Sequence, residues 1–331
     1  MYFLKFILIG VLMEKLFKTV SFMSATLVMV LLASIFISLF HSAKPAIDEY
    51  GFGFITEKAW DKEVPIENSV ATSAPAKKEV PKATSSDDDL ASMMSGSISD
   101  TPMRTIYGGY IPIIGTLLST LIAMAFALPI AMGIAVFLAE IAPKQISNVV
   151  GIAIELLAAI PSIIFGMWGL FYFAPIVQSF VGGYQVSLLT AGLVLGVMIL
   201  PFMAAITRDS MRTTPDVLKE SAYALGATKF EVIKDIIFPY SKAGIIGSII
   251  LALGRALGET MAVAFLIGSV FSIPTSLTSP TVSIPVAMAN SFGEATGMKT
   301  SALFYLAFLL FIISFAVISI AKFYFLRKDN K

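Results

Sequence analysis

The chain has 331 residues, of which 57% are hydrophobic and only 14% are charged, against about 25% charged residues in ordinary soluble domains. A soluble protein of this length could not cover so much apolar surface with so few polar residues. The formal net charge of +1 supplies no basic field for a nucleic acid. This composition excludes a cytosolic enzyme, a nucleic-acid-binding protein and a fibrous protein, and it indicates a membrane protein.

Six hydrophobic stretches are long enough to cross a bilayer, which takes about 20 apolar residues. In chain order they are roughly 19–40, 111–139, 148–177, 187–207, 243–270 and 302–325. Pro129 and Pro161 lie inside the second and third stretches, where each removes a helical hydrogen bond. Membrane proteins tolerate such breaks where protein or water satisfies the backbone. We therefore predict an all-α membrane protein, a packed bundle of six transmembrane helices with a pathway.

Lys and Arg lie unevenly between these stretches. They precede the first span, occupy the short loop 140–147, crowd the loop 208–242 and follow the last span. The loop 178–186 has none, and 271–301 has only Lys299. The positive-inside rule then predicts that both termini are cytoplasmic, in a multi-pass protein of the inner (plasma) membrane.

The same pattern divides the chain into four parts. We expect an N-terminal segment with the first span (1–41), an extracytoplasmic segment (42–108), a helical core (109–326) and a cytoplasmic tail (327–331). The first apolar run is longer than the core of a signal peptide, so we interpret it as a retained anchor. Residues 1–13 are either an interfacial helix or the start of this span. Within 42–108, residues 61–104 are rich in Ser, Ala, Pro, Lys and Asp, which predicts a flexible polar insert.

The sequence offers little for covalent or metal chemistry. It has no cysteine and a single histidine, His41, so disulfides, iron–sulfur clusters and zinc sites built on Cys or paired His are excluded. We expect no catalytic residue and no metal site. Because no G-x-x-x-x-G-K-[ST] phosphate loop is present, a partner chain must bind ATP and its magnesium if the protein uses ATP. We expect no cofactor in this chain.

The loop 208–242 is too polar to span a membrane and predicts two short helices. Pro215 can start the first, over 216–225, and Gly226 can end it in a left-handed conformation. The second, about 228–237, is expected to stop before Pro239. Two short helices around a glycine would form a rigid knob that can dock into a groove of a partner.

This loop resembles the EAA loop of binding-protein-dependent ABC importer permeases. Glu220-Ser221-Ala222 is followed after three residues by Gly226, and nine residues later Ile236 precedes Phe238-Pro239. Ser221 and Phe238 depart mildly from the family's Ala and Leu. The resemblance implies a MetI-like permease core and a role for Glu220, Ser221, Ala222 and Gly226 in coupling to cytoplasmic ATPase subunits.

Apart from Lys322 near the end of the last span, three charged residues lie within the hydrophobic stretches of the core. Arg255 and Glu259 are four residues apart, so on one helix they would share a face. A charge inside the membrane is costly and faces a cavity or a partner. Arg255 could bind an anion in transit with Glu259 beside it, or the two could form a structural pair. Glu155 could act as a gate or pair with a basic residue of another helix, or it could be a buried structural carboxylate.

Longer runs resemble the PstC permeases of phosphate uptake systems. They are Gly-Arg-Ala-Leu-Gly-Glu-Thr-Met-Ala (254–262), Ile-Glu-Leu-Leu-Ala-Ala-Ile-Pro-Ser-Ile-Ile-Phe-Gly-Met-Trp-Gly (154–169) and Met-Ile-Leu-Pro-Phe (198–202). The resemblance implies inorganic phosphate as substrate, a ligand that the planar fork of an arginine suits. It also implies a PstA-like second permease subunit, two PstB-like ATPase subunits and a periplasmic phosphate-binding protein as partners.

Two alternatives remain open at this point. The same kind of permease could carry another oxyanion, such as phosphonate, sulfate or molybdate. An ion-coupled secondary transporter would need internal repeats with interrupted helices, and it would leave the 208–242 loop unexplained.

Overall fold

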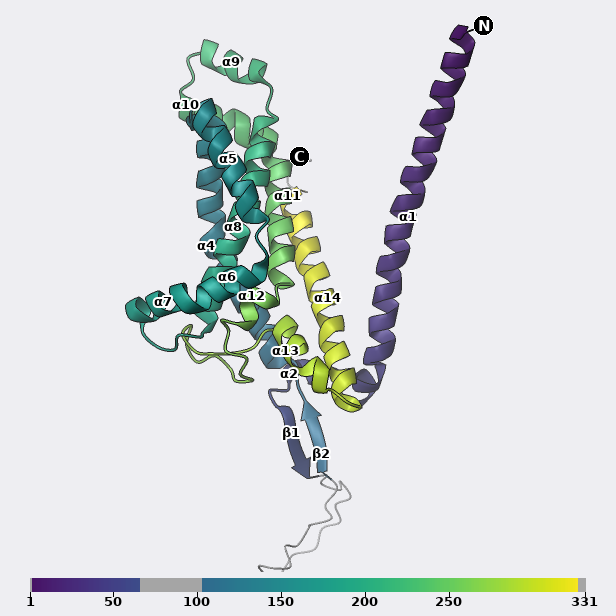
Figure 1. Cartoon of the computed structure of the whole chain (residues 1–331), viewed down its shortest axis with the longest axis vertical. Helices are drawn as coiled ribbons and strands as arrows, with labels where there is room; N and C mark the ends of the chain where they lie inside the picture. The colour runs from purple at the N-terminus through teal and green to yellow at the C-terminus, as the bar shows by residue number, and fades with distance from the viewer. Residues whose placement is uncertain (1, 66–102, 327–331) are drawn as a thin grey trace, which may run out of the picture. The chain divides into compact units, whose positions relative to one another are not determined.

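The computed structural model describes residues 2–65 and 103–326 (Figure 1). These residues fall into two units, a helical one that includes the chain up to residue 58 and from 108 onward, and a small one within 59–107. The long helices are α1 (Tyr2–Tyr50), α4 (Tyr110–Val136), α5 (Lys144–Ala158), α8 (Leu188–Arg212), α11 (Phe238–Leu257) and α14 (Met298–Leu326). Shorter helices are α2 (Gly53–Thr56), α6 (Ser162–Trp168), α7 (Ala174–Val181), α9 (Asp216–Ala224), α10 (Lys229–Glu231), α12 (Met261–Ala264) and α13 (Ile284–Ser291). Three π-helical turns, η1 (Phe137–Ile141), η2 (Gly169–Phe173) and η3 (Val232–Ile237), and the 3-10 turn η4 (Phe292–Glu294) complete the helical elements.

Six helical segments among the described residues are long and apolar enough to cross a membrane, as predicted. The helical unit is built around α8, whose span is the most buried of the six. Gly192 and Gly196 let α8 approach α4, because a Cβ on either would come within 3.0 Å of Ile122 or Phe126. Small residues at a crossing allow this close packing where lipid gives helices no hydrophobic reason to associate.

The first helix is continuous from Tyr2 to Tyr50, so residues 2–13 start the long first helix and do not form a separate interfacial one. Its C-terminal half packs on α14, where Phe36 and Phe40 meet the ring of Phe308 at centroid distances of 5.3 and 5.6 Å. Beyond α1, Phe54 is fully buried and stacks on Tyr305 at 4.5 Å. The aromatic segment after the first span is therefore ordered against α14.

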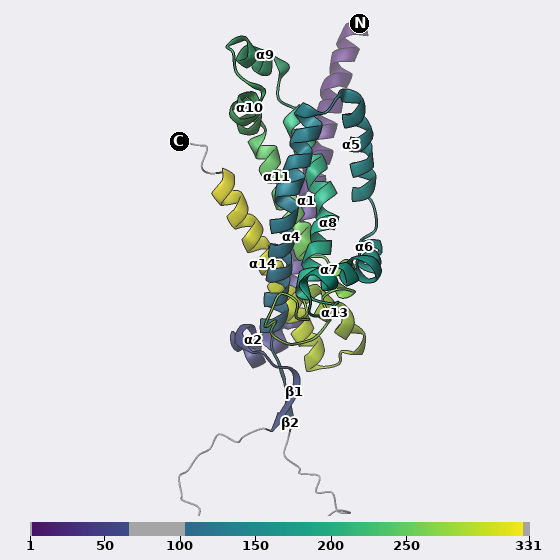
Figure 2. The same ribbon diagram turned by 90° about the vertical axis from the view of Figure 1, so that its left-hand side faces the viewer.

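The third predicted span, 148–177, is broken. Helix α5 ends at Ala158, and α6 starts only after Pro161, because a proline lacks the N–H that the helix needs and restricts the residue before it. Figures 1 and 2 show α5 running along α8 while α6 and α7 run across the bundle. The helical segment long enough to span here is 162–181.

The fifth predicted span, 243–270, is also wrong at both ends. The helical run begins at Lys229 and stops at Leu257, with Gly258 as its C-cap. After the short α12, the chain is irregular and packs on the start of α8, where Ser187 and Leu189 donate backbone hydrogen bonds to Leu266 and Leu277.

The small unit adds one pair of strands to a structure that is otherwise helical, as predicted. Strands β1 (Trp60–Pro65) and β2 (Met103–Tyr107) form an antiparallel pair, so the ends of the expected flexible insert are β-structure. Trp60 packs edge-on against Tyr107 at 5.4 Å, and the Tyr107 hydroxyl donates to Asp61 Oδ1 at 3.1 Å. Most of the insert, residues 66–102, lies outside the described residues.

Candidate functional site

The loop between α8 and α11 forms two short helices around a glycine. Asp216 opens α9 directly after Pro215, and Gly226 follows α9 with a φ of +89°, the left-handed conformation that favours glycine. Thr228 then starts α10 through a capping box with Glu231. The predicted stop before Pro239 is wrong. The helix continues because the π turn η3 precedes Pro239, which occupies the first turn of α11 where a proline is tolerated.

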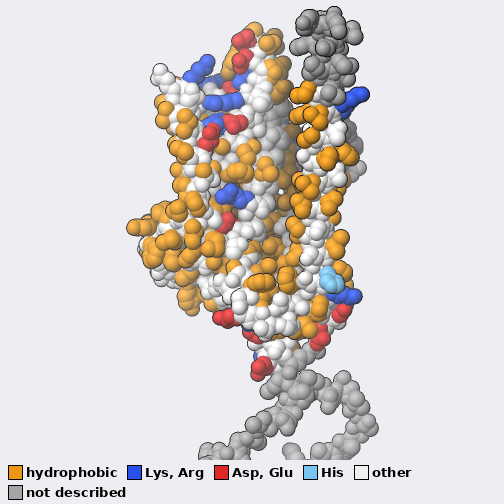
Figure 3. Space-filling model, turned by 45° about the vertical axis from the view of Figure 1, so that its right-hand side comes forward, with side chains coloured by type: hydrophobic (Ala, Val, Ile, Leu, Met, Phe, Trp, Pro, Cys, Tyr) orange, Lys and Arg blue, Asp and Glu red, His pale blue; other side chains and the backbone are white. Residues whose placement is uncertain are grey.

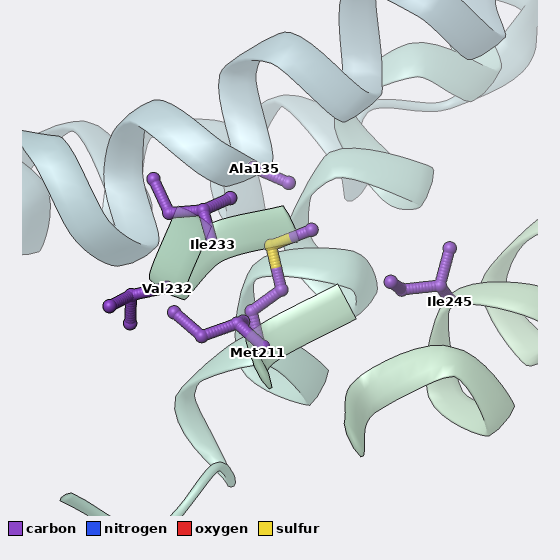
Figure 4. Packing of buried hydrophobic residues seen from close by; sticks show 6 residues of the cluster. Ala135, Met211, Val232, Ile233 and Ile245 are labelled. Atoms are coloured by element: carbon purple, nitrogen blue, oxygen red, sulfur yellow. The ribbon is translucent and has the colours of Figure 1, made fainter. Parts of the chain in front are cut away.

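One side of this loop is fixed to the bundle by apolar packing. Ala135 of α4, Met211 of α8, Val232 and Ile233 of η3 and Ile245 of α11 form one buried cluster (Figure 4). Ala222 of α9 and Ala227 pack against it. The small third residue of the Glu-Ser-Ala motif therefore lies at a contact with the bundle.

An ion pair fixes α9 at a second point. Lys219 Nζ lies 2.8 Å from Glu140 Oε1 of η1, and both side chains are largely buried, with 16% and 11% of their surface exposed. A shielded pair of this kind is screened much less than one in open water. The packing and the ion pair together allow a force on α9 to reach α4, α8 and α11.

The other side of the loop faces outward. Glu220 and Ser221 are exposed, and the Ser221 hydroxyl donates to Val217 O within the helix at 2.7 Å. Apolar side chains are exposed beside them: Val217 (70%), Tyr223 (45%), Leu225 (89%) and Phe230 (72%). On the face drawn in Figure 3, charged side chains gather at this end of the bundle, whereas most of the length below is hydrophobic. Exposed aliphatic and aromatic side chains around a carboxylate form a surface suited to a partner protein.

Glu155 pairs with a basic residue of another helix, one of the roles considered for it. Its Oε1 accepts a hydrogen bond of 2.8 Å from Arg208 Nη2 of α8. Arg208 also bonds Asp209 Oδ1 at 2.7 Å, and its side chain is only 6% exposed, whereas Glu155 is 56% exposed. Gly151 makes room for the guanidinium, since a Cβ there would lie 1.9 Å from Arg208 Nη1. Glu155 is thus not a buried carboxylate, and the buried member of the pair is the arginine.

Arg255 and Glu259 do not share a helix face. Arg255 is in the last turn of α11, and Glu259 lies beyond the helix end. Its Oε1 accepts a hydrogen bond of 3.2 Å from the amide of Ala262, in the first turn of α12. Arg255 is exposed and its guanidinium lies 5.8 Å from the centre of the Phe202 ring. Within the described part of the chain no carboxylate forms an ion pair with Arg255. The four-residue spacing misleads because Gly258 ends the helix between them.

Sequence reasoning missed three residues of this region: Arg208, Glu140 and Gly151. In the sequence, Arg208 is one of several basic residues of the loop 208–242, and neither Arg208 nor Glu140 belongs to a motif. A signal did exist for the arginine. Gly151 and Glu155 are four residues apart and therefore neighbours on one face of a helix. Because Gly151 has no side chain, it leaves space beside the Glu155 carboxylate, which predicts a long basic side chain from a neighbouring helix.

Comparisons with known proteins show what this chain is similar to. The family model described as "Binding-protein-dependent transport system inner membrane component" matches residues 127–328. A protein of Pasteurella multocida named "Phosphate transport system permease protein PstC" is 39% identical over 96% of this chain and 93% of its own length. One of the same name from Haemophilus influenzae is 41% identical over 93% and 92%. The solved inward-facing MetNI methionine ABC transporter is 21% identical with a TM-score of 0.48, covering 65% of this chain and 93% of that one.

The family match and the six apolar helices among the described residues thus identify a multi-pass inner-membrane permease subunit, and membership of this transport family implies a non-enzymatic chain. The family match covers more than half of the chain, and the relatives are similar over nearly all of it. The chain belongs to the family of binding-protein-dependent transport system inner membrane components, with the PstC permeases as its relatives.

Proposed function

We propose that this chain is a permease subunit of an ATP-driven importer of inorganic phosphate and forms part of the translocation pathway. The substrate is supported by the names of relatives that are 39% and 41% identical over more than nine-tenths of the chain. The observation that carries the mode of action is the loop, which is fixed to three spans on one side and exposes a mixed apolar and acidic surface on the other.

Coupling follows from these two sides. The outward side of α9, with Glu220 and Ser221, docks on a cytoplasmic PstB-like ATPase subunit, and two such subunits bind ATP and magnesium. The inward side, with Ala222 and the Lys219–Glu140 pair, passes their movement to the bundle. Gly226 fixes the angle between the two short helices through its left-handed backbone. This chain then needs no cofactor of its own.

The assembly requires further partners. A PstA-like second permease completes the pathway, and a periplasmic phosphate-binding protein delivers the substrate. The loop with α9 and both termini lie on the cytoplasmic side, because Lys and Arg are concentrated there.

Arg255 is the residue of this chain that we assign to the anion pathway. A guanidinium within an apolar span cannot remain exposed to lipid without a large cost, yet no described carboxylate forms an ion pair with Arg255, whose guanidinium lies 5.8 Å from the centre of the Phe202 ring. Its polar surroundings must therefore come from water, substrate or the second permease. Glu259 supports this site indirectly by capping α12, and Glu155 by holding Arg208.

Anion competition in transport tests the substrate. Membrane vesicles or cells that contain the complete importer are given labelled phosphate with a hundredfold excess of phosphonate, sulfate or molybdate. The positive control is a hundredfold excess of unlabelled phosphate, and we expect only this control to suppress uptake. If one of the other anions suppresses phosphate uptake and is itself taken up, that anion and not phosphate is the substrate. Recovery of an ATPase subunit with the tagged chain from detergent extracts tests the ATP-driven mode independently.

A further inference from the structure

A polar cavity of about 300 Å³ lies where η1, the start of α5 and the end of α8 meet. Lys144, Ser147, Asn148 and Arg212 form its polar wall, and Leu138 and Ala142 contribute apolar surface. Its lining residues include neither the exposed residues of α9 nor Arg255. The cavity is therefore separate from the proposed ATPase-docking surface and from the proposed anion pathway.

The polar wall is positively charged, and two of its residues, Ser147 and Arg212, are linked by a hydrogen bond. Ser147 is 2% exposed and donates to the backbone oxygen of Leu138, and Arg212 Nη2 donates to the same hydroxyl at 2.6 Å. No carboxylate among the described residues pairs with Lys144 or Arg212. Glu140 and Asp209 on the adjoining segments are already bound to Lys219 and Arg208.

The backbone adds to this charge. Helix α5 begins at Lys144, directly at the cavity, and no side chain caps its first turn. The free N–H groups and the dipole of a 15-residue helix favour an anion at this end. Two cations and a helix start thus converge on one small space, a donor set suited to the oxygens of a phosphate group.

The surface below the cavity is apolar and faces outward. Val149, Ile152 and Leu156 of α5 are 70%, 59% and 65% exposed, and their spacing of three and four residues puts them on one side of the helix. A free inorganic anion would not contact these apolar side chains, whereas the acyl chains of a lipid would cover them. A basic pocket between spans at the cytoplasmic boundary is where anionic lipid headgroups bind.

We infer that this cavity binds the phosphate group of an anionic phospholipid, whose acyl chains lie along the exposed stripe of α5. The cavity wall includes Leu138 of η1 and Ala142, which follows η1 directly, and η1 also carries Glu140, which pairs with Lys219 of α9. A bound lipid therefore steadies the segment on which the loop is mounted.

The test uses the full-length chain, purified from membranes with the subunits that remain associated, and native mass spectrometry with added lipid. We expect phosphatidylglycerol to be retained in preference to phosphatidylcholine. Replacing both cations, Lys144→Gln with Arg212→Gln, should weaken phosphatidylglycerol binding about 30-fold, the loss expected for two cations near an anionic surface. The matched control is Lys15→Gln with Lys18→Gln on α1. It removes the same amount of charge and should still bind phosphatidylglycerol.

Two further variants keep the result clear if the double variant folds poorly. Lys144→Arg with Arg212→Lys keeps both charges and should retain the lipid. Ala142→Trp fills the cavity without changing charge and should release it. Equal retention of the two lipids, or unchanged binding by the Gln variant, overturns the inference. So does inorganic phosphate that displaces the lipid at millimolar concentration in an Arg212-dependent way, since the cavity would then be a free-phosphate site. None of these readouts depends on which anion the importer carries.

Discussion

At the scale of single residues, Gly151 is the position that lets Arg208 reach Glu155. A Cβ there would lie 1.9 Å from Arg208 Nη1, so Gly151→Ala must move the guanidinium away from its partner on α5. We expect the variant to lose about 1–3 kcal/mol of stability, the usual cost of overpacking, and to melt at a lower temperature in detergent.

A glycine of another helix provides the control. No atom lies within 4 Å of a Cβ placed at Gly247 of α11, so Gly247→Ala should leave the melting temperature unchanged or raise it, since alanine favours the helix. Equal melting temperatures for wild type and Gly151→Ala would show that the Arg208–Glu155 pair does not hold α5 to α8.

Arg255 can be tested by single substitutions, because the structure gives it no carboxylate partner among the described residues. Arg255→Met removes the charge without leaving an unpaired acid in this chain, and we expect it to abolish phosphate uptake. Arg255→Lys keeps the charge but loses the two-pronged bond to an oxyanion, so we expect uptake to fall at least tenfold.

The measurement is uptake in vesicles with the amount of assembled complex determined alongside. Glu259→Gln serves as the comparison: it keeps an acceptor for the Ala262 amide, which Glu259 caps, so most uptake should survive. Near-normal uptake by Arg255→Met would return this arginine to a purely structural role.

At the scale of elements, the conformation of the loop depends on Gly226. Its φ of +89° is strained for any other residue, although nothing lies within 4 Å to block a side chain. The left-handed region costs an ordinary residue about 1–2 kcal/mol, and a β-branched one more. We expect Gly226→Val to turn α9 away from its partner and abolish transport while the protein still inserts. We expect Glu220→Lys, which reverses an exposed charge on α9, also to abolish transport in a protein that still inserts.

Co-purification of the ATPase subunit with each variant gives the readout. Gly297→Val provides a matched control, because Gly297 also has a positive φ, of +56°, and free space around it, but lies just before α14, far along the chain from the loop. We expect this control to keep the ATPase. Normal association and uptake in both loop variants would contradict the coupling role of this loop.

At the scale of the whole molecule, the polar insert can be separated from the strand pair that flanks it. The cost of closing a flexible loop depends only weakly on its length. Replacing residues 66–102 by about ten Gly and Ser residues, with β1 and β2 kept, should therefore leave insertion and most uptake intact. Replacement of 61–104 also removes most of the paired strands and serves as the comparison. If the variant with residues 66–102 replaced loses uptake although its amount in the membrane is normal, the insert docks a partner.

The sequence by itself determined the class of the protein and the position of its most informative loop. Hydrophobic runs of about 20 residues have one stable solution in lipid, since a helix satisfies its own backbone, and six such segments are present among the described residues. The left-handed Gly226 and the short α9 also follow from local chemistry, because a glycine after a helix-forming run ends that helix.

The tertiary structure alone decided where the charged side chains go. A hydropathy run does not show where a helix ends inside it: Pro161 marks the break before α6, but Pro129 lies within the continuous α4, and the end of α11 at Gly258 could not be placed. Glu259 therefore caps α12 and does not accompany Arg255. The partner of Glu155 comes from 53 residues further along the chain, and the partner of Lys219 from 79 residues before it. Such pairs form only where two helix faces lie together, and the packing of segments that are distant in the sequence determines which faces meet.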